Sequence, residues 1–460
     1  MSEFISHFPL SLQMTDSMQQ HPQPLLLTPF ILDGRIEEAR NLAMVKPFLE
    51  NVTSYSGYIT VDEDHQSYMF FWFSPKSTDW VTAALVVWLQ GGFGDSIMYA
   101  VFAQNGPYIY KDDRVDHSQY SWTNYFNVLY IENPIGTGFS FVQFKNGYST
   151  DQTEVGVNLH ETLRQFLILF PELQKNQLIL SGQCYAGKYL TSLANTISQR
   201  QSSTVPRIDV FGIFLGNPMI SIEYMLPHYN EYLYSLGFLD SKTRRTLEQR
   251  EEEILSLILE KNWSNASDLF SKTFAIPSNS EHTSLLQQLN SLPLRNHLNF
   301  SEDTFERPRY EKFLEESETK LALHVGNHVH DANRLEVRNA ILPDLTKSYK
   351  SNFERLLEDY RVLVYSGQLD LVCAYCLNEK LFTRLSWSGA KAYRESNVYQ
   401  FTCGESSVGH FKQGHNFTHV LLRNAGHLAT SDQPRRVLGL LKKFVGGTFD
   451  ECIESLDVQF

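Results

Sequence analysis

Short apolar runs, separated by segments with helical spacing, recur along most of the chain. They are rich in Val, Ile, Leu and Phe, which is typical of strands buried on both faces of a parallel sheet. Residues 154–170 and 433–445 show the periodicity of amphipathic helices. Strands that alternate with helices predict an α/β fold with a largely parallel central sheet flanked by helices. The predicted strands are residues 83–89, 127–131, 177–181, 210–216, 361–366 and 419–423.

Residues 220–345 have a different character. Charged and polar helical stretches such as residues 241–262 dominate there, and runs typical of buried strands are missing. We therefore expect a mainly helical insertion at 220–345 that interrupts a core formed by residues 24–219 and 346–460. Residues 1–23 are expected to be an N-terminal extension.

Charge and hydropathy exclude several classes of function. The formal net charge is -13 and no long basic run is present, which argues against nucleic acid or an anionic membrane surface as the main partner. No apolar run approaches the roughly 20 residues of a membrane span. The N-terminal extension also lacks the basic start and apolar block of a signal peptide, so the sequence leaves the cellular location open.

Cys184 lies in a segment built like a nucleophile elbow. It follows the predicted strand 177–181 directly, precedes a helical segment, and has Gly182 and Ala186 two positions to either side. A strand–turn–helix with small neighbours is what a crowded elbow requires, although the usual nucleophile there is serine. Taken alone, the pattern also fits a buried cysteine beside a tight turn.

An aspartate and a histidine follow Cys184 in the order that an elbow nucleophile requires. Asp370 lies in a turn after the predicted strand 361–366, and His427 lies in a turn after the predicted strand 419–423. Each residue also has a simpler interpretation: Asp370 could be an aspartate that caps a turn, and His427 could be a surface histidine. The order and the shared context favour a catalytic set of Cys184, Asp370 and His427.

The strand at 83–89 runs into a Gly-rich turn, which offers a backbone N–H to an oxyanion in such sites. We expect the donors to be the N–H groups of Gly92 and Tyr185. A phosphate-binding loop is the alternative, but the turn lacks the G-K-[ST] ending and the G-x-G-x-x-G spacing.

The chain contains five cysteines. A count that is both low and odd argues against a fold held together by disulfide bonds. Cys373 and Cys376 form a C-x-x-C without a second pair, and we interpret both as ordinary packed thiols. His410, His415 and His419 cluster in the sequence without an acidic or cysteine partner at ligand spacing. We therefore expect neither a metal nor an organic cofactor.

Several motifs together resemble the successive signatures of the serine carboxypeptidases, and two further segments, residues 24–39 and 323–327, are similar to the vitellogenic carboxypeptidase-like branch. The resemblance implies an α/β-hydrolase fold with a helical cap. It implies removal of C-terminal residues from peptides through an acyl-enzyme, with peptide or protein C-termini as partners, and it admits a homodimer. The motifs are WLQGG (88–92), QNGPY (104–108), YIENPIGTGFSF (130–141), GQCYAGKY (182–189), EYLYSLGFLD (231–240), YSGQLD (365–370) and AGHLATSDQP (425–434).

Under this resemblance, Cys184 occupies the position of the family's nucleophilic serine, with Asp370 and His427 as its partners. The substrate's terminal carboxylate is expected at Gln90, the N–H of Gly91, Gln104 and Gln183. The family has glutamates at the last two positions, and a protonated carboxyl is needed there to face a carboxylate. An amide donates at any pH, so binding in this chain is expected to lose its acid dependence.

The departures from the family allow two outcomes. Phe93 replaces a proline of the Gly-rich turn and Asp95 enters beside it, so the oxyanion donor is expected to be displaced. One outcome is a converted Cys-His-Asp carboxypeptidase with impaired or altered activity. The other is a catalytically inactive homologue that acts as a peptide-binding or regulatory protein. In that case we expect an inert thiol at Cys184 or a groove blocked by Phe93.

Overall fold

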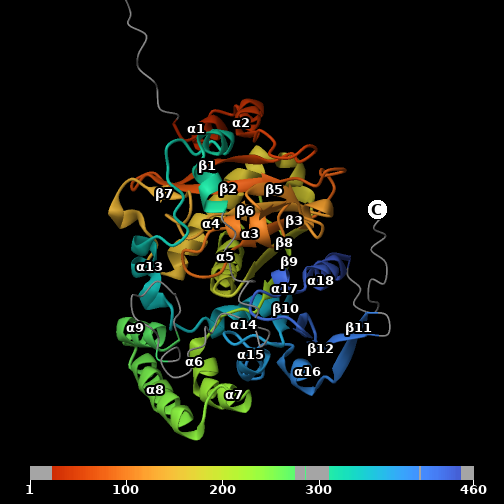
Figure 1. Cartoon of the computed structure of the whole chain (residues 1–460). Coiled ribbons are helices and arrows are strands. Elements are labelled where there is room, and N and C mark those ends of the chain that lie inside the picture. Colours follow the sequence, from red (N-terminus) through yellow and green to blue (C-terminus); the bar gives the residue numbers. More distant parts are fainter. Residues whose placement is uncertain (1–22, 275–284, 286–309, 404–405, 447–460) are drawn as a thin grey trace, which may run out of the picture.

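The structure is a computed structural model that describes residues 23–274, 285, 310–403 and 406–446 (Figure 1). Most of the predicted N-terminal extension and part of the predicted insertion, residues 275–284 and 286–309, lie outside the described residues.

A single mixed sheet runs through the molecule. Its order is β1-β2-β6-β3-β8-β9-β10-β13-β12-β11, and β7 pairs with β2. The six strands from β6 to β13 in this order are parallel to one another, and the pairs on either side of them are antiparallel. The strands are β1 (Tyr55–Asp62), β2 (Ser67–Ser74), β3 (Leu85–Leu89), β6 (Asn127–Ile131), β7 (Phe141–Val142), β8 (Leu178–Gln183), β9 (Val210–Gly216), β10 (Arg361–Gly367), β11 (Val398–Cys403), β12 (Ser406–Gly414) and β13 (Phe417–Leu422), with β4 (Tyr108–Lys111) and β5 (Arg114–His117) as a separate pair.

The six predicted strands are confirmed as β3, β6, β8, β9, β10 and β13, with ends within two residues of those expected. The antiparallel strands β1, β2, β11 and β12 were not predicted. Their addition makes the sheet mixed, with an all-parallel centre, as the apolar runs indicated.

Helices cover both faces of the sheet. On one face, apolar residues of α4 (Gln152–Leu169), α5 (Ala186–Arg200) and α14 (Lys350–Asp359) share a core with the sheet. On the other, α3 (Met98–Ala103) and α18 (Pro434–Gly446) do so. Apolar side chains that alternate along each strand therefore find an apolar layer on both sides, which explains why the central strands read as continuous apolar runs.

Local capping fixes where long helices begin. Asp151 precedes α4 and its carboxylate accepts the N–H groups of Thr153 and Glu154 at 2.8 and 3.1 Å. Asp240 and Thr243 form a reciprocal capping box at the start of α8. Each cap satisfies N–H groups that have no partner within the helix, which stabilises it by about 1 kcal/mol.

The described residues between 220 and 345 are mainly helical and contain no strand. Helices α7, α8 and α9 lie together at one end of the molecule, drawn in green in Figure 1. Helices α11 and α12 belong elsewhere, since Phe313 packs on Phe48 and Phe102 and the backbone of Leu323 accepts from Ser56 of β1. The helices of this block are α6 (Ile222–Met225), α7 (Tyr229–Ser235), α8 (Ser241–Leu259), α9 (Trp263–Phe274), α11 (Tyr310–Glu315), α12 (Ser317–Ala322) and α13 (Leu335–Ile341).

The remaining helices are short. They are α1 (Thr28–Leu32), α2 (Ile36–Ala43), α15 (Tyr375–Phe382), α16 (Ala390–Glu395) and α17 (Ala429–Asp432), with 3-10 turns that include η4 (Leu226–His228) and η6 (Leu342–Asp344). Among the described residues, no helix has both the length and the apolar character that crossing a bilayer would need.

Candidate active site

Cys184 lies in a strained turn between β8 and α5. Its φ is +56°, in the left-handed region that a side chain rarely adopts. A Cβ added at Gly182 would lie 2.6 Å from the carbonyl oxygen of Leu89, so only glycine fits there. Backbone hydrogen bonds of 2.9 Å from Cys184 N to Gly216 O and from Met219 N to Cys184 O hold the turn. The sequence predicted a strand–turn–helix around Cys184, and the structure has one.

Asp370 and His427 meet because their strands are neighbours. β10 pairs with β13 in parallel, so the turns that follow both strands lie at the same edge of the sheet. His427 Nδ1 lies 3.0 Å from Asp370 Oδ2. Asp370 Oδ1 accepts the N–H groups of Val372 and Cys373 at 2.6 and 3.0 Å, and Asn217 Nδ2 donates to Oδ2.

This environment keeps Asp370 ionised. The side chain is fully buried, which by itself would raise its pKa. The charge and hydrogen bond of His427, with the donated N–H groups, outweigh burial and hold the pKa below its usual value. Burial lowers the pKa of His427, but Asp370 and Cys184 together raise it well above its ordinary value. These shifts favour an imidazolium at His427 paired with a carboxylate at Asp370.

A second cysteine completes the group. The Sγ atoms of Cys184 and Cys373 and a ring nitrogen of His427 all lie within 4.8 Å of one another. A hydrogen bond from Cys373 is the largest cause that lowers the pKa of Cys184 to about 5; burial opposes it, and the charge and hydrogen bond of His427 lower it further. Burial and the neighbouring thiolate raise the pKa of Cys373. Cys373 is buried in the apolar core, as the interpretation of a packed thiol expects, and its Sγ also lies beside Cys184. Cys376 is exposed rather than packed and does not belong to this group.

The Gly-rich turn packs directly on the elbow. A Cβ added at Gly91 would lie 1.9 Å from Gln183 O and 2.7 Å from Cys184 Cβ, and Gly92 has a φ of +90°. Both positions therefore need glycine. Within the described part of the chain, the N–H groups of Gly92 and Tyr185 have no protein acceptor. These are the donors that the sequence indicated for an oxyanion.

The amides expected at the substrate's carboxylate are buried beside the elbow. Gln104 Nε2 donates to Gln183 Oε1 at 3.2 Å, and Gln183 Nε2 donates to Gln104 Oε1 at 3.4 Å. Gln90 Oε1 accepts from Trp88 Nε1 at 3.2 Å, which leaves the amide N–H groups of Gln90 for another acceptor.

Phe93 and Asp95 occupy positions next to the Gly-rich turn. The Phe93 ring is buried and its centroid lies 5.3 Å from that of Tyr185, so it belongs to the core. A Cβ added at Gly92 would lie 2.2 Å from Asp95 Oδ2, which places this carboxylate against the turn. Asp95 lies 3.6 Å from Arg338 of α13, which offsets its charge.

Two residues of the site were not predicted from the sequence, Cys373 and Asn217. Asn217 follows β9 with a φ of +44°, and its side chain donates to both Asp370 and the carbonyl of Gly426. An asparagine after a buried strand is a signal for a turn, but it does not show which carboxylate the amide will reach.

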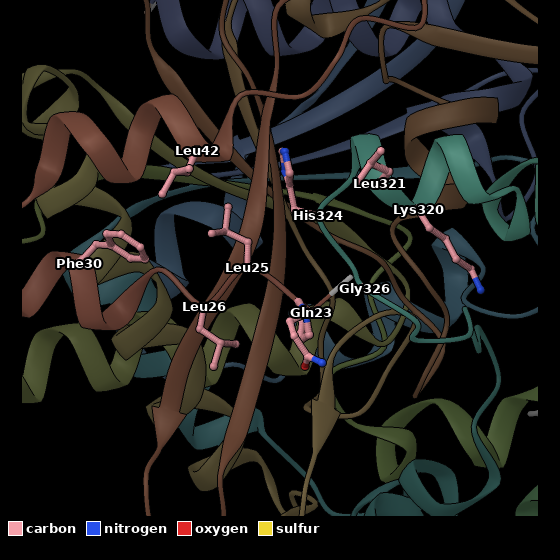
Figure 2. A pocket seen from close by; sticks show the side chains of 10 residues that line it. Gln23, Leu25, Leu26, Phe30, Leu42, Lys320, Leu321, His324 and Gly326 are labelled. Atoms are coloured by element: carbon pink, nitrogen blue, oxygen red, sulfur yellow. The ribbon is translucent and has the colours of Figure 1, made fainter. Parts of the chain in front are cut away.

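An apolar pocket elsewhere carries no such chemistry. Figure 2 shows it between the N-terminal segment and the region of α12. Its two titratable side chains already have partners, since Lys320 pairs with Glu315 at 2.5 Å and His324 lies 3.2 Å from Ser56 Oγ. The lining residues are Gln23, Pro24, Leu25, Leu26, Phe30, Leu42, Lys320, Leu321, His324 and Gly326.

Comparison with known proteins gives consistent matches. The sequence model of the serine carboxypeptidases matches residues 45–447. The chain is 37% identical to a venom serine carboxypeptidase of Apis mellifera, over 92% of this chain and 90% of that one. It is 34% identical to a vitellogenic carboxypeptidase of Aedes aegypti and 33% identical to a probable serine carboxypeptidase of Homo sapiens, each over 92% of this chain and 90% of the relative.

A solved structure shares the fold. The chain superposes on a prohormone-processing carboxypeptidase of Saccharomyces cerevisiae with a TM-score of 0.72 and 20% sequence identity, over 89% of this chain and 95% of that one.

Proposed function

This chain belongs to the serine carboxypeptidase family, and from that premise we propose that it removes C-terminal residues from peptides with Cys184 as its nucleophile. One observation carries the proposal: the Cys184 thiol lies on an elbow beside a histidine whose other nitrogen is held by Asp370. A nucleophile, a base and a group that orients the base form the minimal set for acyl transfer.

The proposed reaction has two steps. The Cys184 thiolate attacks the last peptide carbonyl, and the N–H groups of Gly92 and Tyr185 stabilise the oxyanion. His427 then gives its proton to the leaving amine, which departs as the free C-terminal residue and leaves a thioester. His427 next takes a proton from water, and the resulting hydroxide attacks the thioester and regenerates the thiolate.

Gln104, Gln183, Gln90 and the N–H of Gly91 are proposed to hold the substrate's terminal carboxylate. Each buried amide of the Gln104–Gln183 pair uses one N–H for its partner and keeps a second for a ligand. Because amides do not titrate, this binding does not require acid.

We propose that the rate is lower than in a serine enzyme of the same shape. Thiolates of low pKa are weaker nucleophiles, and the hydrogen bond from Cys373 stabilises the thiolate further. The Asp95 carboxylate beside Gly92 opposes negative charge at the oxyanion, although Arg338 offsets part of its effect. If these two effects abolish cleavage, the alternative function is binding of peptide C-termini, for which the Gln104–Gln183 pair remains suited.

The first test combines thiol labelling with hydrolysis. We expect Cys184 to react with iodoacetamide with a midpoint near pH 5, in line with its pKa of about 5, and Cys184→Ala to lose both this labelling and the cleavage of a blocked dipeptide. Cys376 serves as the internal reference: burial raises its pKa to about 11, so it should label only at a much higher pH than Cys184.

Labelling of Cys184 only above pH 8, with no cleavage between pH 4 and 9, would overturn the catalytic proposal. In that case, Cys184→Ala should still bind a peptide with a free C-terminus and not its amidated form, which calorimetry measures.

A further inference from the structure

Three soft donor atoms converge at the elbow. Cys184 Sγ, Cys373 Sγ and a His427 ring nitrogen are mutually within 4.8 Å, and the donors come from three different turns of the sheet edge. The C-x-x-C spacing does not produce this group, because Cys376 takes no part in it. Catalysis by a Cys-His-Asp set uses Cys184 and His427 and does not require a second thiol at Cys373.

The separations suit a tetrahedral metal ion. Zn²⁺ binds thiolate at about 2.3 Å and imidazole at about 2.0 Å, so donors around one ion lie roughly 3.5–3.8 Å apart. From separations within 4.8 Å, the three atoms need to approach one another by no more than about 1.3 Å. Two cysteines and one histidine form a known zinc ligand set that leaves a fourth position for solvent or substrate.

The residues around the donors are arranged as in metal sites. Asp370 holds His427 through Nδ1 at 3.0 Å, which leaves Nε2 as the ligand atom. The same carboxylate accepts the backbone N–H of Cys373 at 3.0 Å, so it positions two of the three ligands. A carboxylate that orients a ligating histidine is a common outer-shell partner of zinc.

The charges also balance. The two thiolates carry two negative charges and the histidine is neutral when it ligates, so a divalent cation neutralises the ligand set. Cys373 is fully buried, where an uncompensated charge is costly. When the ion binds, the Cys373 thiol proton and the His427 Nε2 proton pass to solvent.

We propose that Cys184, Cys373 and His427 form a reversible binding site for a thiophilic divalent cation of the zinc class, with Asp370 as the carboxylate behind it. The ion occupies the Cys184 thiolate, so the metal-bound chain cannot use that thiolate as a nucleophile. Only this last consequence depends on the proposed function.

Binding is tested on the full chain, kept reduced and free of metal, by titration with Co²⁺. We expect a thiolate-to-cobalt charge-transfer band that saturates at one ion per chain and disappears when Zn²⁺ is added. Zn²⁺ should also protect Cys184 from alkylation in the wild-type chain, a result that requires no variant.

Cys373→Ser and Cys376→Ser form a matched pair within the same C-x-x-C. Loss of the Cys373 ligand is expected to weaken Co²⁺ binding by more than about 100-fold, since removal of an outer-shell partner alone costs 10–100-fold. Cys376→Ser is expected to bind as the wild type does, and Asp370→Asn to bind about 10–100-fold more weakly.

The proposal is overturned if no thiolate-to-cobalt band forms, if Cys373→Ser binds as tightly as Cys376→Ser, or if Zn²⁺ does not protect Cys184. Hydrolysis in the presence of a chelator is measured in parallel. Cleavage without metal binding would refute only the proposed metal site. Metal binding without cleavage would refute only the proposed peptidase activity.

Discussion

At the scale of single residues, the departures around Cys184 form a consistent set. A carboxylate near a thiol raises its pKa, and both positions beside the elbow that carry glutamate in the resemblance are amides here. Order and motif predicted that Cys184, Asp370 and His427 lie together, and the structure brings them together, while their catalytic role stays a prediction. Cys373 and Asn217 were missed because their roles arise from contacts across strands, which spacing along the chain does not reveal.

The amide pair leads to a prediction about pH. We expect the KM of a blocked dipeptide to stay constant between pH 5 and 7 in the wild type, because Gln104 and Gln183 do not titrate. In Gln104→Glu/Gln183→Glu the two buried carboxyls share a proton, and at pH 7 their charge repels the substrate's carboxylate. The KM of this variant should be at least about 10-fold higher at pH 7 than at pH 5.

An amidated dipeptide serves as the control, because it has no terminal carboxylate to be repelled and its weak binding should not depend on pH. A KM in the double variant that is as flat as that of the wild type would show that the pair does not contact the terminal carboxylate. Should the chain prove inactive, the same comparison applies to the Kd of the peptide.

At the scale of elements, predictability followed burial. The central strands were identified because both faces are covered, so their sequences are continuously apolar. Strands β11 and β12 lie at one margin of the sheet. They contain the polar residues Gln400, His410 and Lys412, so their sequences do not form the continuous apolar runs that identified the central strands. Their place depends on pairing with distant strands, which local pattern does not encode.

Helix α5 shows how an element that presents the elbow is fixed to its surroundings. Lys188 is fully buried one turn after Cys184, and its Nζ donates to the carbonyls of Asp344, Leu345 and Lys347 at 2.9, 2.8 and 2.8 Å. Burial lowers its pKa to about 8. These bonds join α5 to the segment that follows α13.

We expect Lys188→Met to lower the free energy of unfolding by about 2–4 kcal/mol, because three buried carbonyls lose a charged donor while the apolar stem is kept. Urea denaturation at pH 7 measures the change. Arg200→Met, at the exposed end of the same helix, is the control and should stay within about 0.5 kcal/mol of the wild type. Equal stability of both variants would show that the lysine bonds add nothing to the fold.

At the scale of the whole molecule, a buried polar chain joins the sheet to the segment before α13. Glu132 follows β6, and its Oε1 lies 2.6 Å from Ser96 Oγ, which in turn lies 2.9 Å from His330 Nε2. Burial raises the pKa of Glu132 to about 8, against the hydrogen bonds of Ser96 and Ile97, and lowers the pKa of His330 to about 4. Ser96 Oγ donates to the Glu132 carboxyl, and the neutral imidazole of His330 lies on the other side of the same hydroxyl.

This arrangement predicts how stability depends on pH. A carboxyl whose pKa is higher in the folded than in the unfolded state stabilises fully below its unfolded value of about 4.3, and this stabilisation is lost as pH rises toward its folded value of about 8. The free energy of unfolding of the wild-type chain should therefore fall by up to a few kcal/mol between pH 5 and 9 because of this group. Glu132→Gln should not show this fall, because the amide stays neutral over this pH range and its oxygen can still accept the N–H of Ile97.

Urea denaturation of wild type and Glu132→Gln at pH 5, 7 and 9 isolates the effect, since Cys184, His427 and Glu251 titrate equally in both chains. We expect similar stability at pH 5 and a variant that is more stable than the wild type at pH 9. Exposed Glu38→Gln is the control and should follow the wild type throughout. Parallel pH profiles for wild type and Glu132→Gln would mean that Glu132 is ionised in the folded chain, and the link between sheet and α13 would then depend on an imidazolium at His330.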